Sequence, residues 1–209
     1  MSMRRSERPR PPGHGLRARS WRQVEFASLD FETTGLDQQQ DAIVSFGVVP
    51  VRAGRVVVGG SVHQLVVPAV PSSPGSMRIH GILPKDLADA PPPKVAAATL
   101  RDAIDRRFLL AWYASVEIAF LSRLFGGRAR SWVRRTIDVR QMAIELERLD
   151  QDVRHTLSST AQRYGVPVAN PHEALDDAMV TAQLFLVIAS RLEERGLGSV
   201  RSLLRLTRI

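Results

Sequence analysis

The chain has 209 residues, 44% hydrophobic and 24% charged, which is the composition of an ordinary globular protein and is long enough for one well-packed domain. It contains no cysteine, so disulfides and thiolate metal sites are excluded. No apolar run approaches the length needed to cross a bilayer, and the Arg-rich start lacks the apolar core of a secretory signal, so we expect a cytoplasmic protein.

The net charge of +8 is concentrated at the N-terminus. Residues 1–22 hold seven arginines and one glutamate, a net +6, and leave +2 for the rest of the chain. This segment is also rich in proline and glycine, which predicts a disordered basic arm. Its two possible roles are a solvated tail and an arm that binds phosphates without sequence preference. A domain over residues 23–195 and a tail or short helix over residues 196–209 would follow.

Three strands are predicted first in chain order, over residues 24–29, 42–51 and 56–67. Each is rich in β-branched and aromatic residues, and Ala53-Gly54 forms the turn between the second and the third. Strands joined by short turns form an antiparallel meander. A loop rich in proline and serine follows over residues 68–76.

Helices dominate the remainder of the chain, with two short strands among them. We expect the strands over residues 109–114 and 132–137, because each is a short apolar run. The predicted helices cover short pieces within 77–87, then 94–108, 116–125, 138 to about 149, 156–164, 173–195 and 199–206. This order predicts an α/β fold with a mixed five-stranded sheet, three antiparallel and two parallel strands, flanked by helices on both faces.

Two acids with one residue between them, Asp30 and Glu32, follow the first predicted strand. Alternate residues of a strand share a face, so both carboxylates project side by side and Phe31 points to the other face. Two anions this close repel each other. The alternatives are a solvated strand, a structural ion pair with an arginine, and a divalent-metal site, since Mg²⁺ prefers carboxylate oxygens. The turn residues 33–35 end the strand beside the acids, as a metal site requires.

A second polar cluster opens the long helix predicted over residues 173–195. His172 precedes this helix, and Asp177 lies beside Ala178 on its apolar face, where an unpaired acid is costly. His172 and Asp177 converge on one site only if His172 lies at the flexible entry to the helix. A helix-capping role is the alternative for these residues.

Five segments, taken in order, resemble the DEDDh 3′–5′ exonuclease superfamily, whose familiar member is the epsilon proofreading subunit of bacterial DNA polymerase III. The likeness covers roughly residues 24–190 and implies a ribonuclease H-like fold, in agreement with the predicted order of elements. The segments are DFETTG (30–35), IVSFGVV (43–49), IHGILPKDLADAPP (79–92), TIDVRQMAIEL (136–146) and HEALDDA (172–178).

The resemblance implies hydrolysis of phosphodiester bonds with two divalent metal ions, Mg²⁺ or Mn²⁺, as cofactors. It assigns Asp30 to both ions, and it assigns Glu32 and Asp177 to the ion that carries the nucleophile. It makes His172 the general base, because histidine readily exchanges a proton near neutral pH.

The same resemblance implies a place for the 3′ end of the substrate. Thr33 and Thr34 are expected near the terminal 3′-hydroxyl. Ile79 and His80 are expected to line the pocket of the terminal nucleotide. A purely structural role is the alternative for His80.

This chain departs from the usual form of the family's middle motif, which is His-Asn-x-x-Phe-Asp. Aligned by its flanks, this chain has Trp112 and Tyr113 in place of His-Asn, Val116 in place of Phe and Glu117 in place of Asp. Glutamate keeps the charge and extends the reach by one methylene, roughly 1.5 Å. Glu117 is therefore predicted to hold the second metal, and an ordinary solvated acid at a helix start is the alternative.

Two classes of function follow from these observations. One is an active exonuclease that digests 3′ ends of nucleic acid, single-stranded DNA first and RNA as the variant. The other is a catalytically weak module that binds nucleic acid or a polymerase or repair partner. Retention of three acids and His172 favours the enzyme, whereas the altered middle motif leaves room for the module.

Overall fold

A mixed β-sheet lies at the centre of the computed structural model, which describes residues 8–126, 129–148, 150 and 155–207. Its spatial order is β3-β2-β1-β5-β6, and β4 also pairs with β2. β1 runs antiparallel to β2 and parallel to β5, and β5 runs parallel to β6. The strands are β1 (Glu25–Thr33), β2 (Ile43–Arg52), β3 (Arg55–Val56), β4 (Val62–Leu65), β5 (Phe108–Ala111) and β6 (Thr136–Asp138). The predicted α/β fold with a mixed sheet is confirmed.

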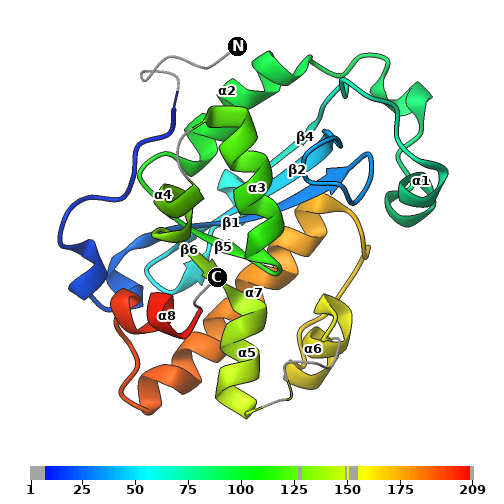
Figure 1. Cartoon of the computed structure of the whole chain (residues 1–209). Coiled ribbons are helices and arrows are strands. Elements are labelled where there is room, and N and C mark those ends of the chain that lie inside the picture. The colour runs from blue at the N-terminus through cyan, green and yellow to red at the C-terminus, as the bar shows by residue number, and fades with distance from the viewer. Residues whose placement is uncertain (1–7, 127–128, 149, 151–154, 208–209) are drawn as a thin grey trace.

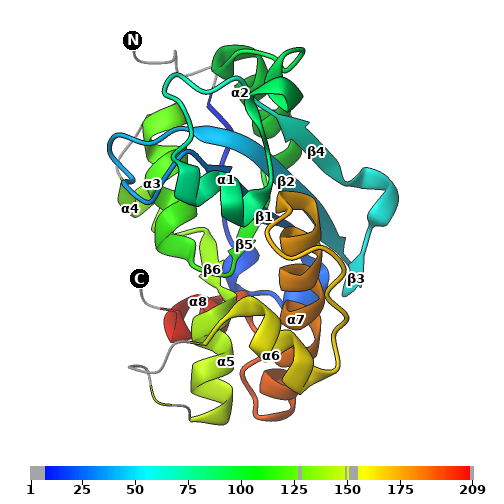
Figure 2. The same ribbon diagram turned by 90° about the vertical axis from the view of Figure 1, so that its right-hand side faces the viewer.

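Helices cover both faces of this sheet (Figure 1). The long helix α7 crosses one face with α5, α6 and α8 beside it, and α2 and α3 cover the other (Figure 2). The α-helices are α1 (Pro74–His80), α2 (Pro93–Ile104), α3 (Ala114–Phe125), α4 (Ala129–Val133), α5 (Val139–Glu147), α6 (Leu157–Tyr164), α7 (Ala174–Glu194) and α8 (Val200–Leu206). Short 3₁₀ helices are η2 (Leu16–Ala18), η3 (Trp21–Gln23), η4 (Val58–Gly60) and η5 (Pro84–Leu87). None of the helices described is both long and apolar enough to span a bilayer.

The side chains of β1 point alternately to the two faces of the sheet and so belong to two separate hydrophobic cores. Phe26 packs against Phe185 of α7, whereas Leu29 and Phe31 belong to the core under α2 and α3. Side chains two residues apart share a face, so Asp30 and Glu32 lie on the α7 face. The placement of both acids opposite Phe31 follows directly from the sequence pattern.

The N-terminal segment differs from the disordered arm expected over residues 1–22. Residues 8–22 lie along the folded body, and residues 1–7 fall outside the described ranges. Trp21 is 1% exposed in the α7-side core, and its amide donates to the carbonyl of Gly198. Arg22 forms an ion pair with Glu193 at 2.9 Å, and Arg10 forms one with Asp105. A buried tryptophan and two acids on the body thus anchor this segment. Its charge and proline content had predicted disorder.

Several element boundaries also differ from prediction, and three of the differences have a clear cause in the sequence or the core. The third strand is broken into β3 and β4 by η4, where two successive glycines interrupt the β-branched run. The helix predicted over 94–108 ends at Ile104, because Phe108 begins the buried strand β5. The strand predicted over 132–137 starts only at Thr136. Trp132 instead lies in α4, where its ring fills the core beside Phe125.

Gly47 of β2 lets α7 approach the acids. It lies directly opposite Asp30 in the β1–β2 register. A Cβ at this position would lie 2.2 Å from the carbonyl oxygen of Ala174 and 2.5 Å from the Cα of Leu175. The first turn of α7, which carries Asp177, therefore packs on bare backbone next to Asp30.

Gly47→Ala is expected to lower the free energy of unfolding by about 1–3 kcal/mol, the usual cost of overpacking. The obstructing atoms are backbone atoms, so the relief must come from a shift of α7, which also separates Asp177 from Asp30. Denaturant unfolding measures the first effect, and divalent-metal affinity by calorimetry measures the second. Gly59→Ala is the matched control, because nothing lies within 4 Å of its added Cβ. Equal stability of the two variants would contradict the close fit.

Candidate active site

Three acids from two elements converge at the end of β1. Asp30 and Glu32 come from the strand, and Asp177 comes from the first turn of α7. One carboxylate oxygen from each lies within 4.8 Å of the others. Oxygen ligands at such spacing suit a hard divalent cation. The two acid clusters that the sequence singled out therefore meet in one place.

Glu117 joins this group from α3. It is the fourth residue of that helix, and its side chain is buried rather than solvated as a surface acid would be. Its Oε2 is buried and has no hydrogen-bond partner within the described part of the chain. The charge of Glu117 helps to raise the pKa of Asp30, second only to burial. Glu117 is therefore a buried acid that acts electrostatically on Asp30, and its role as a metal ligand stays a prediction.

The electrostatics of the cluster are unfavourable without a cation. Burial and then the charges of Glu117, Glu32 and Asp177 hold the pKa of Asp30 well above its usual range. Burial, Asp177 and Glu173 raise the pKa of Glu32 to about 8. Burial is also the main reason that the pKa of Glu117 rises to about 8. An unpartnered carboxylate oxygen among three further acids fits a divalent metal, which offsets the repulsion.

The metal-free protein is expected to lose stability as the pH rises from 4.5, the usual pKa of glutamate, to about 8. In this window the folded state binds more protons than the unfolded state, because Glu32 and Glu117 have raised pKa values. The free energy of unfolding therefore falls with pH. Thermal unfolding in EDTA at pH 5 and pH 8 measures this loss, and Mg²⁺ should reverse it at pH 8. The variant Glu32→Gln/Glu117→Gln should show most of the slope removed, and an unchanged slope would contradict the assignment.

Asp138 is a further acid near the cluster that sequence reasoning did not select. It ends β6 and caps α5, where its Oδ1 accepts from the amide of Gln141 at 2.8 Å. Its Oδ2 accepts from the amide of Ala114 at 3.1 Å, the first residue of α3. Burial raises the pKa of Asp138 to about 6. Asp138 therefore fixes the start of the helix that carries Glu117. Its position at a strand end before a helix was the available signal.

His172 lies in the loop just before α7, at the entry to the helix where the sequence predicted it. Its φ of 65° is left-handed, which few non-glycine residues adopt. Its amide donates to Oδ2 of Asp177 at 3.2 Å. The neighbouring Glu173 lies 3.5 Å from Nε2 of His63, which also bonds the Ser45 hydroxyl at 2.9 Å. The loop is thus tied both to the acid cluster and to β2 and β4.

The predicted 3′-end residues lie around the loop after β1. Thr33 is half-buried, and its hydroxyl donates to the carbonyl of Gly35 at 2.7 Å. Thr34 is fully buried, and its hydroxyl donates to Asp41 at 2.7 Å. Thr34 therefore shapes the loop and has no exposed surface for a nucleotide. Burial lowers the pKa of His80, which lies beside the backbone of Thr33, and Ile79 next to it is 55% exposed.

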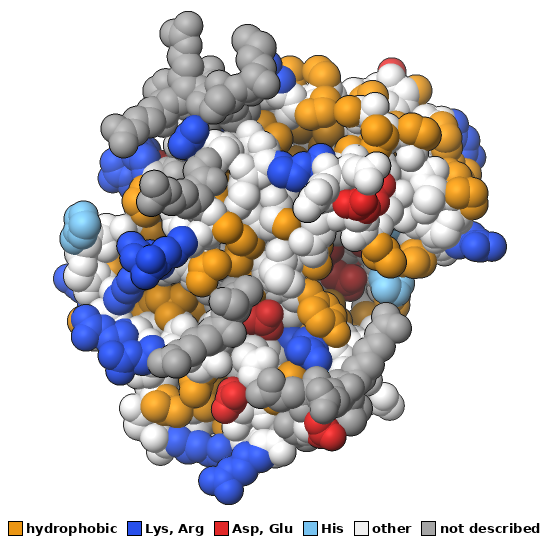
Figure 3. Space-filling model, in the orientation of Figure 1, with side chains coloured by type: hydrophobic (Ala, Val, Ile, Leu, Met, Phe, Trp, Pro, Cys, Tyr) orange, Lys and Arg blue, Asp and Glu red, His pale blue; other side chains and the backbone are white. Residues whose placement is uncertain are grey.

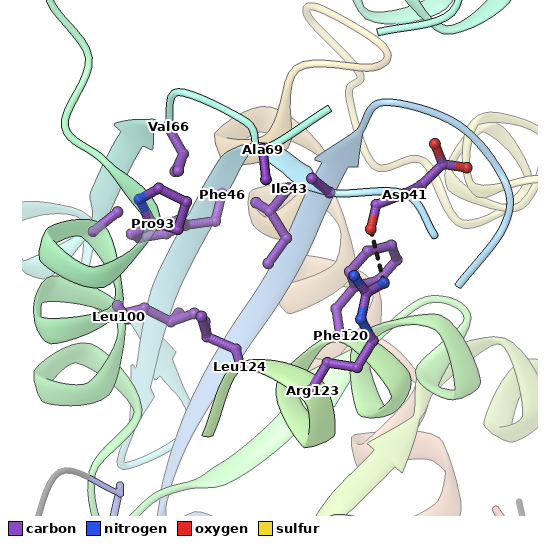
Figure 4. A pocket seen from close by; sticks show the side chains of 13 residues that line it. Asp41, Ile43, Phe46, Val66, Ala69, Pro93, Leu100, Phe120, Arg123 and Leu124 are labelled. Atoms are coloured by element: carbon purple, nitrogen blue, oxygen red, sulfur yellow. Dashed lines mark hydrogen bonds between the residues drawn. The ribbon is translucent and has the colours of Figure 1, made fainter. Parts of the chain in front are cut away.

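Arg123 of α3 also holds the loop after β1, beside an apolar pocket of about 230 Å³ between α2, α3 and β2 (Figure 4). The pocket faces away from the acids, because its wall includes Phe46 and Phe120 of the other core. At its mouth, Arg123 of α3 donates to the carbonyls of Gln38 and Asp41 at 2.6 and 2.7 Å. The helix that carries Glu117 is thereby joined to the loop that follows Asp30 and Glu32.

The sequence of this chain is similar to those of known proteins. The family model described as exonuclease, of RNase T type, matches residues 28–185. A PolC-type DNA polymerase III of Thermotoga petrophila is 31% identical over 180 residues, 85% of this chain and 13% of that protein. The 3′–5′ exonuclease DinG of Staphylococcus saprophyticus is 24% identical over 187 residues, 88% of this chain and 20% of that protein. This chain thus spans only a small part of these relatives.

One solved structure shows the same fold over nearly its whole length. Exonuclease X, in complex with 5′ overhanging duplex DNA, has a TM-score of 0.65 and 24% identity to this chain. The match covers 87% of this chain and 99% of that one. The sheet and the helices that position the acids therefore recur in a known nuclease structure.

Proposed function

This chain belongs to the RNase T family of 3′–5′ exonucleases, and from that membership we propose that it removes nucleotides from the 3′ end of DNA with two divalent metal ions. The observation that carries the proposal is the convergence of Asp30, Glu32 and Asp177 within 4.8 Å, with the buried Glu117 close enough to raise the pKa of Asp30. Three carboxylates this close, with a fourth acting on one of them, are costly unless they hold cations.

The four acids would hold the metals, Mg²⁺ or Mn²⁺, by their carboxylate oxygens. When bound, such a pair activates water and stabilises the charge that develops on the phosphate. Asp30, whose pKa is raised by all three other acids, would contact both ions. Glu32 and Asp177 would hold one ion, and Glu117 would hold the other directly or through water.

His172 would act as the general base that takes a proton from the attacking water. Its place in the loop before α7 keeps it outside the buried acids, where a water molecule and the substrate can reach it. The bond from its amide to Asp177 holds the backbone of this loop against one of the proposed metal ligands. A positioned base of this kind contributes about 10²–10⁴-fold to a rate.

The 3′ end of the strand would lie against the loop after β1. Thr33 and the loop shaped by Thr34 would border the terminal sugar, and Ile79 and His80 of α1 would form the wall beside the base. Ile79 is the exposed apolar residue of this group, and a nucleobase offers a matching apolar face.

The preference for DNA is tested with labelled single-stranded DNA and RNA of one sequence, each with Mg²⁺, Mn²⁺ or EDTA. We expect shortening of the DNA from its 3′ end with either metal and none in EDTA. Faster shortening of the RNA would instead assign RNA as the substrate.

The alternative function is a catalytically weak module that binds nucleic acid or a polymerase or repair partner. The observation that favours it is the altered middle motif, in which Trp112 and Tyr113 precede α3 and Glu117 replaces the usual aspartate. Glu117 therefore decides between the two functions.

Glu117→Ala is expected to reduce cleavage in Mg²⁺ by roughly 10²-fold or more, because one lost ligand removes several kcal/mol of charge stabilisation. Mn²⁺ should restore part of the rate, since its coordination is less demanding than the octahedron of Mg²⁺. Glu117→Asp should stay active. Single-turnover cleavage of all three proteins in each metal gives the answer, and Glu145→Ala, an exposed glutamate on α5, is the control. Wild-type rates for Glu117→Ala in both metals would remove Glu117 from the site.

A further inference from the structure

A basic groove lies where α4 and α8 meet the N-terminal segment, outside the acid cluster. It is a hollow of about 600 Å³, and none of its lining residues is acidic. In the orientation of Figure 1, blue side chains gather over the side of the molecule where α4 and α8 lie (Figure 3). The lining residues are Arg17, Val133, Arg134, Arg201, Leu204, Arg205 and Thr207.

The four arginines of the basic groove are not matched by acids. Within the described part of the chain none of them forms an ion pair, and Arg17 donates only to the carbonyl of Arg134. Arginines elsewhere on the body, such as Arg22 and Arg107, do face acids. Four like charges drawn from three separate segments repel one another, so the groove attracts an anion.

Thr207, which also lines the groove, carries a hydroxyl. Thr207 is 2% exposed, and its Oγ1 is buried without a hydrogen-bond partner among the described residues. A buried hydroxyl without a partner costs free energy that a ligand oxygen can recover. Val133 and Leu204 add aliphatic surface beside it. Guanidinium groups, a hydroxyl and aliphatic walls together suit the phosphates and sugars of a nucleic-acid strand.

We propose that the basic groove binds the phosphate backbone of a nucleic-acid strand at a distance from the 3′ end under cleavage. This inference rests on the proposed function for the position of that 3′ end. Figure 3 shows acidic side chains in a hollow on the same face of the molecule as the arginine-rich side, so one strand can reach both. A concave groove favours a strand over a flat anionic membrane.

The test measures binding in EDTA, where metal-dependent cleavage does not occur. The variant Arg201→Gln/Arg205→Gln removes two charges from the exposed side of α8. The control Arg52→Gln/Arg55→Gln removes two charges from the hairpin that ends in β3, which lies on the opposite side from α8 in Figure 2. Fluorescence anisotropy gives the Kd for a 30-nucleotide and a 5-nucleotide DNA strand between 50 and 200 mM salt.

We expect the α8 variant to bind the long strand about tenfold more weakly at low salt, with a salt slope smaller by about 1.4 for two lost phosphate contacts. Binding of the short strand and the values for the control should not change. The variant Arg201→Lys/Arg205→Lys keeps the charge and should bind almost like wild type, which separates loss of charge from damage to α8.

Equal Kd values and slopes for the α8 variant and the control would overturn the proposal. Binding of wild type to phosphatidylglycerol vesicles, but not to the long strand, would overturn it in favour of a membrane. Absence of nuclease activity together with the expected binding changes would overturn the proposed function alone and leave the groove as a nucleic-acid site.

Discussion

Asp30→Ala is expected to abolish the proposed metal-dependent cleavage, with a loss of at least about 10³-fold. Asp30 interacts with every other acid of the cluster, since Glu117, Glu32 and Asp177 each raise its pKa. Removing it takes a ligand from both proposed ions, and several kcal/mol of charge stabilisation correspond to three or more decades of rate. Single-turnover cleavage of a 3′-terminal nucleotide in Mg²⁺ measures the loss.

The stability of the Asp30→Ala variant separates this role from a structural one. Without metal the variant should melt no lower than wild type, because a repelled and buried carboxylate has been removed. With Mg²⁺ it should lose the thermal stabilisation that wild type gains. Asp89→Ala makes the same substitution at an exposed aspartate and should leave both measurements unchanged. Full activity of Asp30→Ala would refute the metal site.

His172→Asn is expected to lose about 10²–10⁴-fold in rate while its metal affinity persists. Asparagine tolerates the left-handed backbone that this position requires, so the bond from the amide to Asp177 should remain. Asparagine has no group that accepts a proton, so the base is lost. Alanine at the same position would add the strain of its left-handed φ, roughly 1–2 kcal/mol, to the loss of the base.

The pH profile identifies the base. A base must be uncharged to take a proton, so the wild-type rate falls at acid pH, and this part of the fall should be missing from His172→Asn. Calorimetry with Mn²⁺ tests whether the ligands are intact. His14→Ala, at an exposed histidine of the N-terminal segment, is the control. Loss of metal affinity in His172→Asn would make His172 structural instead.

The faces on which the three clustered acids lie could be predicted because they depend on local periodicity, whereas their joint metal site was implied by the resemblance to the exonuclease family. The two-residue repeat of β1 placed Asp30 and Glu32 on one face, and the apolar stripe of α7 placed Asp177 on the buried side. Glu117 was found only through the flanks of an altered motif, since the residues before it have changed. Its burial is a property of the fold.

Other features depend on tertiary contacts that no local pattern reports. In the sequence Gly47 is an ordinary strand residue, and only the folded structure shows that the backbone of Ala174 packs against it. Trp132 has strand propensity, yet the core beside Phe125 holds it in a helix. Trp21 anchors a segment whose composition suggested disorder, because its partners come from the far end of the chain.

Acids that hold catalytic metal ions would make the chain a metal-dependent enzyme that works from the 3′ end. The decisive measurement is a time course in Mg²⁺ of a single strand labelled at its 5′ end, beside a circular strand of the same sequence. We expect a ladder of products that shorten one nucleotide at a time, an intact circle, and no products in EDTA. Cleavage of the circle, or equal cleavage in EDTA, would contradict this expectation.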